Sequence, residues 1–117
     1  MLRLAPFVLV LAACGGGDAA SSGVDSSKKL TELNATERQQ LCEYMVEVEG
    51  GANTSKMCGD GVTITVKSAT DCTSTFSQFE ASCTATVANA EACADAAGED
   101  LCNLVGSSSC AFLFQCL

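Results

Sequence analysis

The stretch Cys83–Cys116 reads CTATVANAEACADAAGEDLCNLVGSSSCAFLFQC and holds five of the nine cysteines in a chain of 117 residues. Runs rich in alanine and leucine lie between these cysteines, have helical spacing, and are separated by glycine and serine. Tryptophan is absent and aromatic residues make up 5% of the chain, so the core lacks large side chains. A single small domain with so thin a core is expected to need covalent cross-links.

Three helical segments are predicted within this stretch. Thr84 or Thr86 caps the first, and Gly98 ends it. A short helical turn over residues 101–105 is closed by Gly106, and serines 107–109 cap the last segment. The residues expected to face inward are Val87, Ala90, Cys93, Ala94 and Ala97 in the first segment, and Cys110, Leu113, Phe114 and Leu117 in the last.

Two further helices are predicted upstream. Asn34 and Glu37 have the spacing of a capping box, and Gly50-Gly51 ends the helix that follows. A second capping signal, Ser68 to Asp71, starts the other helix. The inward faces are predicted to be Leu41, Tyr44, Met45 and Val48, with Cys42 beside them, and then Cys72, Phe76, Phe79 and Cys83.

One segment has strand character instead. Val62 to Lys67 alternates apolar and polar residues and is rich in β-branched side chains, and Asp60-Gly61 before it is a two-residue hairpin signal. We therefore predict a hairpin of residues 56–59 against 62–66. The expected fold class is mainly α: a small disulfide-stapled helical domain of about four helices with one β-hairpin, spanning residues 30–117.

The amino-terminal segment has the order of a signal peptide. A short positive segment at residues 1–3 precedes an apolar run at residues 4–11, which is too short to cross a bilayer as a helix. Leu11-Ala12-Ala13-Cys14 resembles the lipobox of bacterial lipoproteins. In that family a diacylglycerol is attached to the cysteine sulfur, the chain is cut before that cysteine, and the new amine is often acylated.

This resemblance implies a signal peptide at residues 1–13 and lipidation at Cys14, which would anchor the chain to a membrane. Position 15 is Gly rather than Asp, which by the same resemblance implies the outer membrane. Residues 15–29 are rich in glycine and serine, so residues 14–29 are expected to form a lipidated cysteine and flexible tether. The alternative is an ordinary secretory signal, with Cys14 as a ninth disulfide partner.

The eight cysteines after Cys14 form an even set, as a closed disulfide framework requires, and export would supply the oxidising compartment. A zinc or iron–sulfur site is the alternative, but the chain has no histidine and no Cys-x-x-Cys knuckle. We therefore expect no metal, no cofactor and no thiol-exchange motif. The disulfide cysteines are predicted to be Cys42, Cys58, Cys72, Cys83, Cys93, Cys102, Cys110 and Cys116.

Connectivity is open among many pairings, and helix geometry removes two bonds. Cys72 and Cys83 would lie about 16 Å apart on one predicted helix, because an α-helix rises 1.5 Å per residue. Cys110 and Cys116 share the last predicted helix and project in different directions. A disulfide needs Cα atoms within about 7 Å. We therefore expect bridges between different elements.

The carboxy-terminal cysteine spacing also resembles small, cysteine-rich lipoproteins of Gram-negative bacteria. The segments that carry this resemblance are Cys83-Thr84-Ala85-Thr86-Val87, Glu91-Ala92-Cys93, Leu101-Cys102-Asn103-Leu104 and Cys110-Ala111-Phe112-Leu113-Phe114-Gln115-Cys116-Leu117. The resemblance implies a scaffold and a location in the cell envelope, and no activity.

All fourteen acidic residues and five of the six basic ones follow Cys14. So acidic a chain is not expected to bind nucleic acid, which requires clustered Lys and Arg. A solvated acidic surface is the simplest interpretation, and a cationic partner is the alternative. Glu43, Glu47 and Glu49 could hold a cation on one helix, although such a set is more often a solvated face.

These observations predict a membrane-anchored lipoprotein that is not an enzyme. The favoured function is a structural or protein-interaction module with an unknown protein partner. The alternative is a small-ligand or cation-binding lipoprotein that uses the acidic helical faces. A hydrolase is the weakest reading, because the chain lacks histidine and a Gly-x-Ser-x-Gly nucleophile motif.

Overall fold

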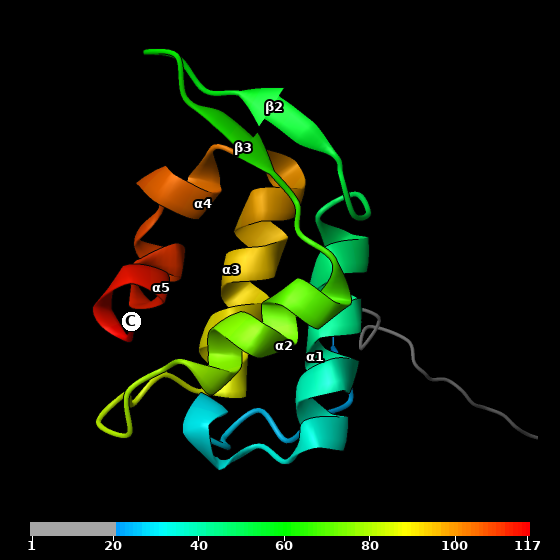
Figure 1. The fold of residues 1–117 in the computed structure, drawn as a ribbon, viewed down its shortest axis with the longest axis vertical. Helices are drawn as coiled ribbons and strands as arrows, with labels where there is room; N and C mark the ends of the chain where they lie inside the picture. The colour runs from blue at the N-terminus through cyan, green and yellow to red at the C-terminus, as the bar shows by residue number, and fades with distance from the viewer. Residues whose placement is uncertain (1–20) are drawn as a thin grey trace, which may run out of the picture.

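The structure is a computed structural model that describes residues 21–117 (Figure 1). The expected signal peptide at residues 1–13 and the expected lipidation site Cys14 lie outside the described residues. No helix among residues 21–117 combines the length and the apolar character that crossing a membrane requires.

Three helices form the body of the domain. They are α1 (Ala35–Val48), α2 (Ala69–Ser77) and α3 (Val87–Glu99). Helices α1 and α3 lie side by side, and α2 crosses over them (Figure 1). The predicted caps begin all three helices, because Asn34, Ser68 and Thr86 each accept a backbone N–H from the third helical residue. The mainly helical fold class is confirmed.

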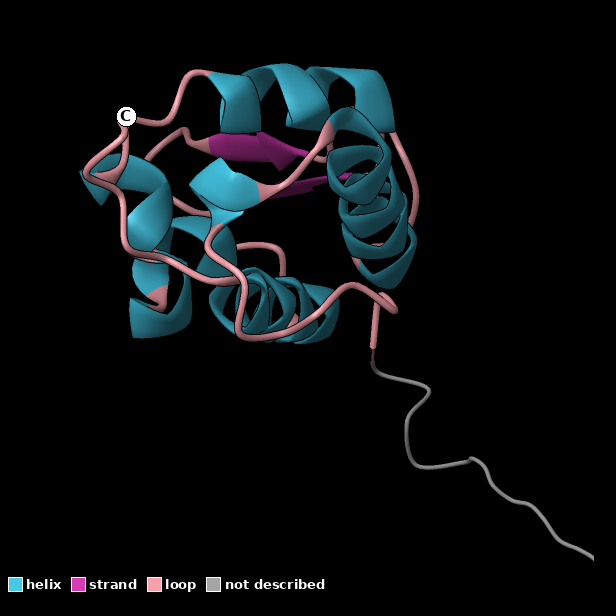
Figure 2. Cartoon of the chain, turned by 90° about the horizontal axis from the view of Figure 1, so that it is seen from below, coloured by secondary structure: helices cyan, strands magenta, loops and turns pink. Residues whose placement is uncertain are grey.

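Short elements complete the domain. A 3₁₀ turn η3 (Leu30–Glu32) precedes α1, while α4 (Asn103–Gly106), η4 (Ser108–Cys110) and α5 (Phe112–Gln115) follow α3. Helix α4 and turn η4 contact α3, so the end of the chain covers the side of α3 (Figures 1 and 2).

The predicted hairpin is confirmed, with shorter strands than expected. Strands β2 (Ser55–Met57) and β3 (Thr63–Thr65) pair antiparallel, with Lys56 opposite Ile64. Asp60 and Gly61 have φ values of 51° and 76°, and the Val62 N–H donates to the Gly59 carbonyl at 2.8 Å. This is the two-residue turn that the Asp-Gly pair predicted.

The core lies among α1, α2, α3 and the two ends of the chain. Leu41, Val87, Ala90 and Ala94 are fully buried, as their helical spacing predicted. Phe79 stacks near Phe76 and meets Phe112 edge-on, with ring centroids 5.2 and 6.4 Å away. A smaller cluster of Val66, Ala97 and Leu101 lies beneath the hairpin.

The predicted helix from Cys72 to Cys83 is too long. Helix α2 ends at Ser77, and Phe79 and Cys83 are buried from the loop that follows. The chain turns there because the Glu80 N–H donates to the Cys116 carbonyl at 2.9 Å instead of continuing the helix. The helical spacing of apolar residues in the sequence therefore extends beyond the last residue of α2.

Gly98 does not end its helix, contrary to prediction. It lies inside α3, which continues to Glu99. A Cβ atom at this position would lie 2.8 Å from the Val48 carbonyl oxygen, at the end of α1. The glycine is therefore required for close approach of the two helices.

The inward face predicted for the last helix is also partly wrong. Phe114 and Leu117 are 61% and 56% exposed, whereas Phe112 is buried. The predicted helix is broken into η4 and α5, with Ala111 between them. That break rotates the residues after Cys110 relative to a continuous helix.

The packed domain begins earlier than the expected boundary at Leu30. Val24 lies in the main core, and the Ser22 hydroxyl donates to the Glu91 carboxylate at 2.6 Å. Residues 28–30 also pair with 85–87 through backbone hydrogen bonds of 2.9 Å. Residues 22–29 are thus part of the domain and are not a flexible tether.

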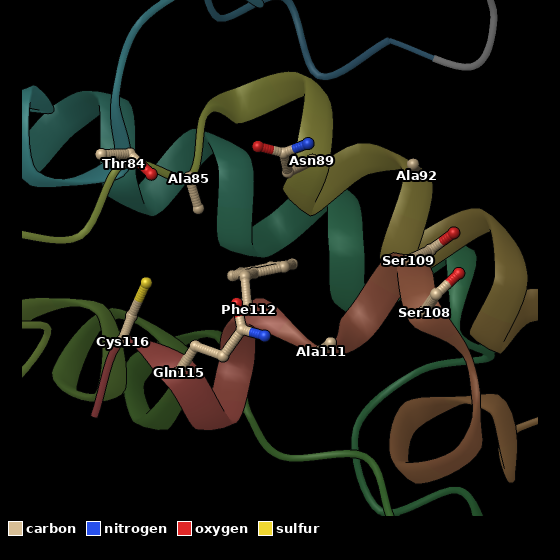
Figure 3. A pocket seen from close by; sticks show the side chains of 10 residues that line it. All are labelled: Thr84, Ala85, Asn89, Ala92, Ser108, Ser109, Ala111, Phe112, Gln115 and Cys116. Atoms are coloured by element: carbon tan, nitrogen blue, oxygen red, sulfur yellow. The ribbon is translucent and has the colours of Figure 1, made fainter.

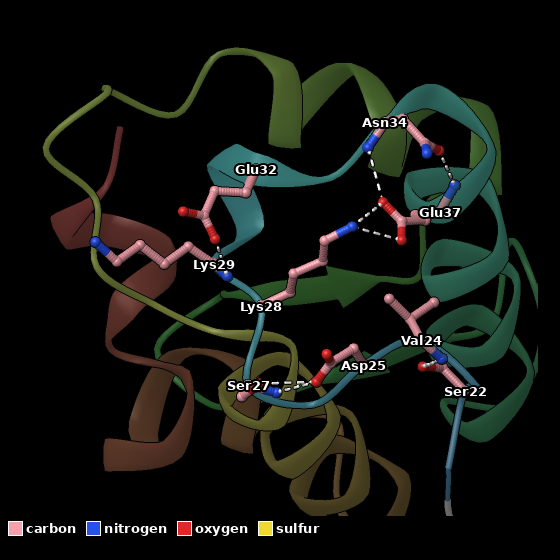
Figure 4. A network of polar contacts seen from close by, with 9 residues as sticks. All are labelled: Ser22, Val24, Asp25, Ser27, Lys28, Lys29, Glu32, Asn34 and Glu37. Atoms are coloured by element: carbon pink, nitrogen blue, oxygen red, sulfur yellow. Dashed lines mark hydrogen bonds and ion pairs between the residues drawn. The ribbon is translucent and has the colours of Figure 1, made fainter.

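A polar network holds this amino-terminal segment against α1 (Figure 4). The Lys28 Nζ donates to both carboxylate oxygens of Glu37, at 2.9 and 2.8 Å. The same carboxylate accepts the Asn34 N–H in the capping box. The hydrogen bond from Lys28 holds the pKa of the Glu37 carboxyl below its ordinary value.

Candidate functional site

All eight predicted disulfide cysteines are paired, and each bridge joins different elements. Cys42 of α1 bonds to Cys72 of α2, and Cys93 of α3 bonds to Cys110 of η4. The remaining bridges are Cys58–Cys102 and Cys83–Cys116, and Cα separations over the four bridges run from 4.7 to 5.8 Å. The two excluded bonds are absent. The expected reason holds for neither pair, because Cys83 lies beyond α2 and the helix expected to carry Cys110 and Cys116 is broken.

The bridges consume every thiol in the described part of the chain. No group of three or more His, Cys, Asp or Glu side chains between residues 21 and 117 is arranged to hold a metal ion. The described cysteines therefore cross-link the scaffold and leave no thiolate for metal ligation or nucleophilic attack.

The three carboxylates of α1 do not converge. Glu43 and Glu47 are exposed, and Glu43 accepts a hydrogen bond from the Gln39 amide at 2.9 Å along the same helix. Glu49, the residue that closes the helix, is partly buried and lines a separate pocket. The alternative of a cation site on these three residues is thus not assembled, and Glu43 and Glu47 lie on a solvated face.

The Glu49 pocket is apolar and has a volume of about 150 Å³. Helices α1 and α2, the end of the hairpin, α4 and α5 each contribute to its wall. The apolar residues that line it are Met45, Val46, Val66, Phe76, Leu104 and Leu113. Sequence reasoning missed this site because its walls come from five separate segments with no shared motif.

Burial controls the electrostatics of this pocket. Loss of water around the carboxylate raises the pKa of Glu49 to about 7. Lys67 is the other ionisable residue of the lining, and it forms no ion pair with Glu49. The pocket therefore combines apolar walls with one poorly solvated carboxyl group.

A second, larger cleft of about 520 Å³ lies between α3 and the end of the chain (Figure 3). Its walls carry hydroxyl and amide side chains, and Phe112 lies at its centre. The residues that line it include no charged side chain. The Asn89 Oδ1 already accepts the Thr86 N–H at 2.8 Å, so part of this polar lining serves the cap of α3.

No protein-family model, curated protein or solved structure matches this chain.

We predict that Glu49→Gln stabilises the domain at pH 8 and leaves it nearly unchanged at pH 4. The folded-state pKa of Glu49 lies above its ordinary value of 4.5, so the folded state binds the extra proton between about pH 4.5 and 7. The parent protein therefore loses stability as pH rises through that window. Discounted for partial exposure, the gain for Gln at pH 8 is about 1–2 kcal/mol.

Chemical denaturation of both proteins at the two pH values, with disulfides intact, measures this difference. Glu47→Gln is the matched control, because Glu47 is exposed on the same helix, and its effect should be equally small at both pH values. An equal loss of stability with rising pH in Glu49→Gln and in the parent would contradict the prediction.

Proposed function

We propose that this protein is an exported lipoprotein, anchored through Cys14, whose cross-linked domain is a non-enzymatic protein-interaction module of the cell envelope. The observation that carries the proposal is the disulfide pairing of the cysteines. Nine cysteines are present, and eight pair with one another. Cys14 thus has no cysteine of its own chain left as a partner, which favours the lipobox interpretation over a ninth disulfide cysteine.

The pairing also favours export. Four structural disulfides form and persist in oxidising compartments, such as the bacterial periplasm and the cell surface. An anchor on Cys14 would lie eight residues before Ser22, which already contacts Glu91 in the packed domain. The packed domain therefore starts closer to the proposed anchor than expected from sequence, so it would sit close to the membrane surface. Gly15 favours the outer membrane within this proposal.

The interaction role is supported by the surface of the domain. Met57 and Val62 on the hairpin are 71% and 44% exposed, while Phe114 is exposed near the carboxyl end. Large apolar side chains are enriched in protein interfaces, and disulfides keep such a surface preorganised. A rigid scaffold that presents apolar side chains is suited to binding another protein.

Intact-mass spectrometry of the protein purified from bacterial membranes tests the proposal. We expect a chain that begins at Cys14 and carries the added mass of a diacylglycerol, with or without an amide-linked acyl chain. Reduction should add two hydrogen atoms for each of the four disulfides. Cys14→Ser is the matched variant and should abolish both the added lipid mass and membrane association. An unmodified chain that begins elsewhere, or unchanged membrane association of Cys14→Ser, would contradict the anchor.

A further inference from the structure

The Glu49 pocket has the composition of a site for an amphipathic ligand. Its apolar wall includes Val66, Leu104 and Leu113, which come from the hairpin side and the carboxy-terminal helices. Phe76 and Met45 complete this wall from α2 and α1 and are themselves buried in the core. The wall is therefore fixed by the surrounding scaffold, and the Cys42–Cys72 bridge that joins α1 to α2 also lies beside it.

The carboxylate of Glu49 lacks compensation. Within residues 21–117 it makes no hydrogen bond or ion pair, and desolvation alone accounts for its altered titration. A desolvated carboxylate without a partner is unfavourable, and a bound cation would relieve that cost.

The backbone around Glu49 adds to the negative potential. Glu49 closes α1 at its carboxyl end, and the last turns of α1 and α3 contain no basic residue. The two helices end side by side, because Val48 contacts Gly98. Helix carboxyl ends carry partial negative charge and favour a cation nearby. Asp100, close to this end, is already paired with Lys56 at 2.9 Å, so that lysine is not available to Glu49.

We propose that this pocket binds a small amphipathic amine, with the ammonium group at Glu49 and a short alkyl chain against the apolar wall. A volume of about 150 Å³ corresponds to about five water-sized groups, at about 30 Å³ each. That is the size of a free butylammonium ion. Ligands of this size reach only weak affinity, so millimolar binding is expected. The proposal is independent of the lipid anchor.

The first test uses n-butylammonium, n-butanol and butyrate as probes of the oxidised full chain. Methyl resonances of Val66, Leu104 and Leu113 report occupancy of the pocket in NMR titrations. We expect saturable binding of n-butylammonium at pH 8, with n-butanol and butyrate at least about tenfold weaker, because a charge-assisted contact is worth about a factor of ten or more. Butanol binding as tightly as the amine, or no saturable shift with the amine, would overturn the proposal.

The second test removes the charge. Glu49→Gln should weaken n-butylammonium binding at least about tenfold while retaining its shape, and the matched Glu47→Gln should bind like the parent. Near-ultraviolet circular dichroism establishes that both variants are folded. Full affinity in Glu49→Gln, or an equal loss in Glu47→Gln, would assign the binding to general surface charge and would sink the proposal.

The pH profile gives a readout that needs no variant. Glu49 and Lys67 are the ionisable side chains of the lining, from α1 and from the segment after β3, and the other elements contribute uncharged residues. The probe stays cationic between pH 6 and 8, whereas Glu49 titrates at a pKa of about 7. Affinity should therefore fall about tenfold from pH 8 to pH 6. A flat profile would contradict an ammonium–carboxylate contact.

Discussion

Complete reduction of the four disulfides is expected to unfold the domain. The bridges close loops whose ends are separated by 30, 44, 33 and 17 residues. Each such loop restricts the unfolded chain by about 3–4 kcal/mol in the chain-entropy model, although the contributions are not additive. Small domains are stable by only about 5–15 kcal/mol. Loss of all four bridges therefore removes a contribution as large as the net stability itself.

The core of this domain is too small to compensate. Its fully buried large residues are Leu30, Leu41, Val66 and Val87, and five of its buried positions are the cysteines Cys42, Cys83, Cys93, Cys110 and Cys116. Several contacts that define the fold are thus made by the bridges themselves. After reduction, the two cysteines of each pair are also no longer held at the short Cα separation that a disulfide requires.

Circular dichroism and thermal melting in excess phosphine reductant measure this effect, with complete reduction verified by alkylation and mass. The oxidised protein in the same buffer is the control. The double variant Cys58→Ala/Cys102→Ala is a partial control, because it removes only the bridge from the hairpin region to the segment before α4 and keeps the other three bridges. A reduced protein that kept its near-ultraviolet spectrum and melting temperature would refute the disulfide framework.

Gly98→Ala is expected to destabilise the domain by about 1–2 kcal/mol. Alanine normally stabilises a helix interior relative to glycine by about 1 kcal/mol. Here the new methyl group would lie 2.8 Å from the Val48 carbonyl oxygen and 3.2 Å from a methyl of Val48. Backbone atoms cannot rotate away, so α1 and α3 must separate, and forced overpacking costs about 1–3 kcal/mol.

Gly106→Ala is the matched control. Gly106 also lies in a helix, and a Cβ there would meet nothing within 4 Å. This substitution should leave stability unchanged or raise it by up to about 1 kcal/mol, because it restricts the unfolded chain. Denaturant midpoints of the two oxidised variants give the comparison. Stabilisation by both substitutions would contradict the close contact between α1 and α3.

The sequence predicted those features that depend on neighbouring residues. Asn34, Ser68 and Thr86 cap helices because a side-chain oxygen reaches a backbone N–H only three residues away. Asp60-Gly61 forms its turn because both residues tolerate positive φ. The inward residues of α1 and α3 follow from helical period alone.

Tertiary structure decided the features that depend on distant segments. The pairing of the eight cysteines, the end of α2 at Ser77 and the burial of Phe112 all depend on where the last residues of the chain pack. In the sequence, Gly98 is typical of the end of a helix. Only its close approach to Val48 in the structure shows that the glycine is needed for α1 to pack against α3.

The same distinction between neighbouring and distant residues applies to the candidate site. The sequence predicts lipidation at Cys14 because the lipobox is four consecutive residues, and it predicted the eight disulfide cysteines because their even number is a property of composition. It grouped Glu49 with Glu43 and Glu47, whereas the structure separates Glu49 into a pocket. A short motif can be recognised from adjacent residues, but the burial of a carboxylate depends on side chains that reach it from elsewhere in the chain.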